Sequence, residues 1–164
     1  MPLERSEMKL AIDPGSQHVG VSLWLEGKPL PLKTIHAKGE TYEARCQNIR
    51  TQLIAYLCEQ ETAQNSRITD LAIEAFQQKY TRIRRKRGGF VDTTIAIRKL
   101  ERATGFIEGV VQQQFFLSEH NVHRINKGSV PKTQAQLMAH LYKLTGTADA
   151  MDALHIGVLA GFAA

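Results

Sequence analysis

The chain has 164 residues, of which 43% are hydrophobic and 23% are charged, with a formal net charge of +5. This length suits one domain spanning residues 1–164, and the composition excludes a fully disordered or collagen-like chain. No apolar run approaches the roughly 20 residues that cross a bilayer, and the N-terminus lacks the apolar stretch of a secretory signal. We therefore expect an intracellular protein with no membrane segment, in the cytoplasm if bacterial or phage-encoded, or else in an organelle.

The first half of the chain predicts an antiparallel meander, a helix and a further strand. Residues 9–13 (KLAID) and 18–25 (HVGVSLWL) are typical of strands, and the second alternates apolar residues on one face, as in a half-buried strand. A turn signal at residues 26–28 precedes a third, antiparallel strand over residues 32–37. Thr41 is expected to cap an amphipathic helix, and residues 68–76 (ITDLAIEAF) predict a buried strand.

The second half predicts helices alternating with one strand. Residues 77–91 are polar and basic and are expected to form a loop, after which Asp92 would cap a helix. Residues 121–125 predict a fifth strand, Pro131 lies in the expected first turn of the next helix, and residues 148–160 predict the last helix. Parallel crossovers combined with the opening meander give an α/β fold, a mixed five-stranded sheet with helices on both faces.

Four carboxylates stand where apolar or neutral residues are expected. Asp13 ends the first strand, Glu74 ends the fourth, and Asp149 and Asp152 share a face of the last helix. Taken singly, Asp13 could be a turn former, Glu74 a solvent-facing edge residue and Asp149 a helix cap. Together they favour a cluster whose mutual repulsion a divalent cation would remove. Oxygen ligands suit Mg²⁺ or Mn²⁺, and two such ions can flank a scissile phosphate.

The positive charge lies mostly in the second half, where residues 76–164 carry a net +7 against −2 for residues 1–75. Such a distribution favours an anionic polymer as partner, with a solvated basic face as the alternative. Lys132 lies in the expected first turn of a helix, where the helix dipole disfavours a cation. A nearby phosphate or carboxylate cluster would offset that cost; the alternative is a merely exposed lysine.

Four sequence blocks resemble those of the RuvC-type Holliday junction resolvases in order and spacing. They are LAIDPGSQHVGVSL, LAIEAF, SVPKTQAQLM and ADAMDALHIGVLAG, and they run from about Lys9 to Ala160. The resemblance implies an RNase H-like fold and a homodimer that acts on four-way DNA junctions in DNA recombination and repair. The dimer would make paired nicks with Mg²⁺ and without a small-molecule cofactor. It places the catalytic and metal-binding acids at Asp13, Glu74, Asp149 and Asp152, and a catalytic lysine at Lys132.

The chain departs from that family after Glu74, where residues 77–90 are QQKYTRIRRKRGGF. Basic side chains that contact phosphates, together with rings that stack on unpaired bases, suit a distorted junction centre. A flexible charged loop is the alternative. The predicted DNA contacts are Phe76, Lys79, Tyr80, Arg82, Arg84, Arg85, Lys86, Arg87, Arg124 and Lys127.

Other functions fit parts of this pattern. The same carboxylates would serve an RNase H-like enzyme acting on RNA–DNA hybrid or structured RNA, and a non-catalytic junction-binding module would leave them incidental. The Asp-x-Gly start also begins actin-like ATP-binding domains, which need a longer chain. The helix over residues 93–111, with Gly105 and Gly109, is the expected dimer seam. His155 could be a metal ligand or general base, but a surface or hydrogen-bonded core histidine is favoured.

Overall fold

The computed structural model describes residues 4–75, 82–84, 90–92 and 94–164. Its central sheet is built from β1 (Ser6–Asp13), β2 (His18–Leu25), β3 (Lys28–Pro29), β4 (Lys33–His36), β5 (Ser66–Glu74) and β8 (Val122–Ile125). The strand order is β3-β2-β1-β5-β8, and β4 also pairs with β2. Strand β1 pairs antiparallel with β2 and parallel with β5, which pairs parallel with β8. The sheet is therefore mixed, as predicted.

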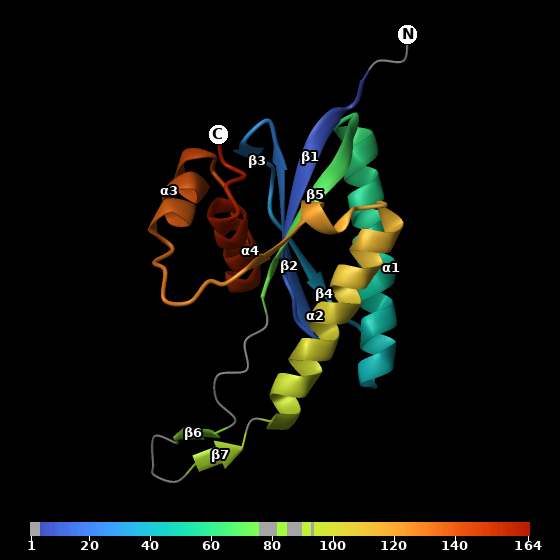
Figure 1. Ribbon diagram of the computed structural model, residues 1–164, viewed down its shortest axis with the longest axis vertical. Helices are drawn as coiled ribbons and strands as arrows, with labels where there is room; N and C mark the ends of the chain where they lie inside the picture. The colour runs from blue at the N-terminus through green and yellow to red at the C-terminus, as the bar shows by residue number, and fades with distance from the viewer. Residues whose placement is uncertain (1–3, 76–81, 85–89, 93) are drawn as a thin grey trace.

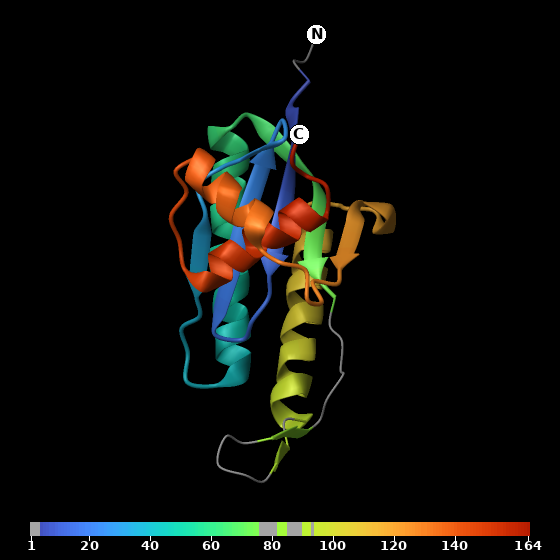
Figure 2. The same ribbon diagram turned by 90° about the vertical axis from the view of Figure 1, so that its left-hand side faces the viewer.

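Helices cover both faces of this sheet, which confirms the predicted α/β architecture. Helices α1 (Tyr42–Ala63) and α2 (Thr94–Gln114) lie on one face, and α3 (Thr133–Leu141) and α4 (Ala148–Leu159) lie on the other (Figures 1 and 2). A 3-10 turn, η1 (Glu119–Asn121), precedes β8. Among the described residues, no helix is long and apolar enough to cross a membrane.

The two faces of the sheet carry side chains of different size. On β1, Met8, Leu10 and Ile12 belong to the buried cluster against α1 and α2, and alternation along the strand turns the intervening residues toward α4. The α4 face has small buried residues toward the Asp13 end of the sheet, namely Ala11, Gly20, Ser22 and Ala72, and the large buried Trp24 further along β2. At Gly20 the absence of a side chain lets the backbone of α4 approach the sheet closely. This closeness also buries both faces of β2, which was predicted to be only half buried.

The edge of the sheet next to β2 is interrupted. Strands β3 and β4 pair with the two ends of β2, and the chain between them contains Pro31. Proline has no backbone N–H to donate to the neighbouring strand, and Pro29 within β3 shares this limitation. The single strand expected over residues 32–37 is thus a shorter one, β4, preceded by the two-residue β3.

Three predicted boundaries in the second half are wrong. The segment predicted as a loop contains two short antiparallel strands, β6 (Arg82–Arg84) and β7 (Phe90–Asp92), which lie apart from the main sheet (Figure 1). Asp92 therefore ends a strand, and α2 begins at Thr94. Helix α3 starts at Thr133 with Lys132 as its N-cap residue, so that Pro131 precedes the helix.

Candidate active site

Two of the predicted acids end neighbouring parallel strands. Asp13 is the last residue of β1 and Glu74 the last of β5, and the register pairs Ile12 with Ile73 immediately before them. Alternation along the two strands turns both acids toward α4, in the same direction as Ala11 and Ala72. Asp13 is buried, with 8% of its surface exposed. Glu74 lies on an interior strand, between β1 and β8, so it is not an edge residue.

Helix α4 supplies the other two acids. Its N-cap is Thr147, whose hydroxyl accepts a hydrogen bond from the Ala150 N–H, so Asp149 lies in the first turn and is not the cap. The Thr147 hydroxyl also lies 2.6 Å from that of Thr34 on β4, which ties the start of the helix to the sheet. Asp152 follows one turn after Asp149 on the same face.

Gly20 allows α4 to approach Asp13 this closely. It is the register partner of Asp13 across β1 and β2. A Cβ at Gly20 would lie 1.9 Å from the Asp149 carbonyl oxygen, well inside any real contact. The missing side chain therefore sets the distance between the acids of α4 and those at the strand ends.

Two lysines face the acids. The Nζ of Lys127 lies 3.3 Å from Glu74 Oε2, 3.8 Å from Asp152 Oδ2 and 4.0 Å from Asp13 Oδ1. Among the described residues, Lys132 forms its ion pair with Asp152. A nearby carboxylate was expected to offset the unfavourable position of Lys132 at a helix start, and Asp152 is such a carboxylate. Acids from β1, β5 and α4 converge on one ammonium group.

The surroundings of Asp13 disfavour its ionised form. Burial raises the pKa of Asp13 from its usual 3.8 to about 7; Lys127 opposes that rise, and Asp152, Glu74 and Asp149 add to it. Burial outweighs the help from Lys127 because the apolar surroundings disfavour the charged form. Near neutral pH the site thus carries more negative charge than its own lysines balance.

The chemistry of the donor set fits a hard divalent cation. Carboxylate oxygens are the ligands that Mg²⁺ and Mn²⁺ prefer, and three of them already surround the positive charge of Lys127. Within the described ranges, no three His, Cys, Asp or Glu side chains stand around a common point at metal-ligand spacing. The carboxylates are arranged instead around the Lys127 ammonium.

His155 lies one turn after Asp152 and is buried, with 2% of its surface exposed. Neither of its ring nitrogens has a hydrogen-bond partner among the described residues. Burial, helped by the positive charges of Lys127 and Lys132, lowers the pKa of His155 below its usual 6.5. It is therefore a neutral core residue at neutral pH, although one without the hydrogen bond that was expected of a core histidine.

Most predicted DNA contacts cannot be placed in this site. Arg82 and Arg84 belong to β6, whereas Phe76, Lys79, Tyr80, Arg85, Lys86 and Arg87 lie outside the described residues. Arg124 on β8 forms ion pairs with Glu108 and with Glu119, the latter at 2.6 Å, and so its charge is shared within the chain. Lys127, predicted to bind DNA, lies among the acids.

Sequence reasoning missed the positions of Lys127 and Gly20. The proximity of Lys127 to the acids depends on how the chain leaves β8, which no local pattern specifies. Gly20 carried a readable signal, because it is the smallest residue on a strand that otherwise alternates large apolar side chains.

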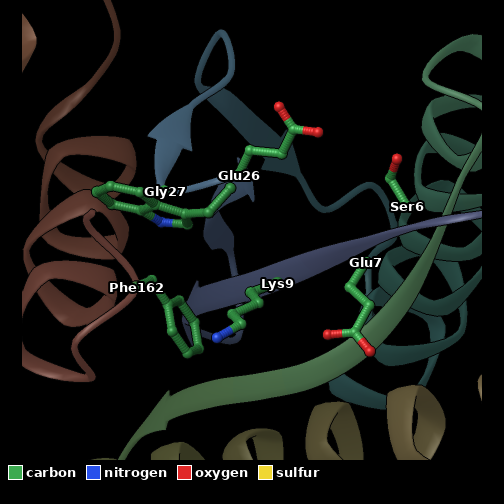
Figure 3. A pocket seen from close by; sticks show the side chains of 7 residues that line it. Ser6, Glu7, Lys9, Glu26, Gly27 and Phe162 are labelled. Atoms are coloured by element: carbon green, nitrogen blue, oxygen red, sulfur yellow. The ribbon is translucent and has the colours of Figure 1, made fainter.

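A separate cavity of about 320 Å³ opens at the other end of β1 (Figure 3). It is lined by Ser6, Glu7, Lys9, Trp24, Glu26, Gly27 and Phe162. Lys9, the lining residue of β1 nearest to Asp13, lies four residues before it, so roughly 13 Å of extended chain separates this cavity from the acids. The cavity is not part of the candidate active site.

The mixed sheet, with helices on both faces, is an RNase H-like fold. It is similar to the structure of Thermus thermophilus RuvC, with a TM-score of 0.64 and 18% identity over 94% of this chain and 93% of that one. The T. thermophilus RuvC in complex with a Holliday junction substrate gives a TM-score of 0.58 and 19% identity, over 95% and 93% of the two chains. No protein-family model and no curated protein sequence matches the chain. The fold expected from the sequence blocks is confirmed.

Proposed function

We propose that residues 1–164 form a single nuclease domain that resolves four-way DNA junctions by metal-dependent hydrolysis of phosphodiester bonds. The observation that carries the proposal is the convergence of Asp13, Glu74 and Asp152, from three separate elements, on one positive charge. Acids brought together at this cost in a partly buried place are typical of a functional site. The likeness in fold to a protein solved with a Holliday junction supports the choice of substrate.

Each residue has a role in this mechanism. Asp13, Glu74 and Asp152 would hold Mg²⁺ or Mn²⁺, and Asp149 would complete or orient the site. The ion, when bound, activates water and stabilises the negative charge that develops at phosphorus. Lys132, with about half of its side chain exposed and its ammonium paired with Asp152, would contact the scissile phosphate. How many ions the site takes depends on Lys127, which lies among the acids.

Junction resolution needs two cuts, and two copies of the chain would supply them. The proposed dimer surface is the face of α2 that carries Gly105 and Gly109. A Cβ at either glycine would meet nothing within 4 Å, so this face is open to close approach by a second copy. Two sites related by a twofold axis would nick two strands of the junction symmetrically. The basic residues between Phe76 and Phe90 are proposed to contact the junction centre.

The proposal is tested by offering the purified chain three labelled substrates: a four-way junction, a linear duplex and an RNA–DNA hybrid. Each is incubated with Mg²⁺ and with chelator. We expect cleavage of the junction alone, and only with Mg²⁺. Cleavage of the hybrid in preference to the junction would instead indicate an RNase H-type activity, and tight junction binding without cleavage would indicate a binding module.

A further inference from the structure

Lys127 is held differently from an ordinary surface lysine. It lies two residues beyond the end of β8, and only 18% of its side chain is exposed. Its Nζ atom lies within 4.0 Å of carboxylate oxygens from Asp13, Glu74 and Asp152, with no single short pair. The ammonium group is therefore shared by three acids, so it supplies the positive charge around which they gather.

Lys132 provides the contrast. Within the part of the chain that the structure describes, its ion-pair partner is Asp152, and 47% of its side chain is exposed. It approaches the cluster from outside, at the start of α3, whereas Lys127 lies inside it. Loss of Lys132 would leave the shared position filled, and loss of Lys127 would empty it.

The position of Lys127 and the charges at the site together limit how many further cations it can take. Among the described residues, four carboxylates, including Asp149, lie near two ammonium groups, which gives a formal charge of −2 with all six groups ionised. One divalent ion would balance this charge. Two would leave an excess of +2 in a partly buried place, with Lys127 close to both, and uncompensated buried charge is costly.

We propose that the Lys127 ammonium supplies one of the two cations expected at this site, so that the chain binds a single divalent ion beside it. The inference rests on the proposed function only in giving the acids a metal-binding role. It replaces the two-ion site expected from the sequence with one ion and one built-in positive charge. Lys127 is then a residue that sets metal stoichiometry, and its predicted role as a DNA contact is not needed.

The test counts bound ions on the full chain without any activity assay. The protein is freed of metal, and Mn²⁺ is titrated in while the electron paramagnetic resonance signal of free Mn²⁺ is recorded. We expect one Mn²⁺ per chain for the wild type, two for Lys127→Met and one for the control Lys132→Met. Two ions in the wild type, or one in Lys127→Met, would overturn the inference. If Lys127→Met does not fold, the numbers of Mn²⁺ ions bound by Lys127→Gln and by the wild type test the inference instead.

The two proposals can fail separately. A count that rises from one to two in Lys127→Met, in a protein that cuts no junction, would keep the inference and refute the nuclease. Junction cleavage by a wild type that binds two ions would support the nuclease and refute the inference. A wild type that binds no Mn²⁺ would refute the metal role and the inference together.

Discussion

Replacing Asp13 with asparagine should change how stability depends on pH. The pKa of Asp13 is about 7 in the folded chain and 3.8 when unperturbed, so the native state keeps a proton that the unfolded chain releases. Wild-type stability therefore falls as pH rises from about 4 to about 7, and it levels off above that. An asparagine side chain does not ionise, so the Asp13→Asn variant avoids this fall.

The size of the effect follows from the two pKa values. Each pH unit between them is worth about 1.4 kcal/mol, so full ionisation of Asp13 costs the native state about 4 kcal/mol. Part of that cost is already present at pH 5. Between pH 5 and pH 8, the stability advantage of Asp13→Asn over the wild type should grow by about 2.5 kcal/mol, and most of this growth should occur below pH 7.

The assay is urea unfolding with chelator present, at unit steps from pH 5 to pH 8. Glu40→Gln, at an exposed carboxylate outside the cluster, is the matched control. If the free energy of unfolding changed with pH in the same way for Asp13→Asn and the wild type, the account of Asp13 as a buried acid with a raised pKa would be refuted.

Three further predictions concern the acids, the close approach of α4 and the basic segment. Asp152→Asn should lower junction cleavage by at least about 100-fold while gel-shift affinity stays equal or increases; an equal loss of binding would contradict the metal role. Gly20→Ala should destabilise the fold by about 1–3 kcal/mol because its Cβ meets the Asp149 carbonyl. Ser22→Ala, on the same face, should be neutral or stabilising because it removes a buried hydroxyl that has no partner among the described residues. Unfolding by denaturant compares the two, and equal losses would refute the packing argument. Neutralising the arginines of residues 82–87 should weaken junction binding and lower the slope of log affinity against log salt by about 0.9 for each phosphate that is no longer neutralised; an unchanged slope would remove this segment from the interface.

The parts of the site that were predictable lie on regular elements. Alternation along β1 and β5 fixes which way Asp13 and Glu74 face, and helical spacing puts Asp149 and Asp152 together. Each of these follows from a local period, and tertiary structure had only to bring the three elements to one place. The parallel pairing of β1 with β5 does so, because neighbouring parallel strands end at the same edge of the sheet.

The parts that were not predictable depend on irregular chain or on long-range distance. The position of Lys127 depends on the path of the residues between β8 and α3, where no period constrains it. The short strands β6 and β7 were missed because each has only three residues, too few to show a period of alternation. The N-cap of α4 was assigned to Asp149 as one alternative, whereas Thr147 is a suitable capping residue two positions earlier.

The central claim is that these converging acids cut DNA junctions, and mapping the cut positions tests it most directly. A fixed four-way junction would be labelled on each strand in turn and incubated with Mg²⁺ and either wild type or Asp13→Asn, and the products would be sized on a denaturing gel. We expect the wild type to give nicks at symmetric positions on two opposed strands, and Asp13→Asn to give none. Cuts that persist at the same positions with Asp13→Asn, or an absence of cuts with the wild type, would contradict the account.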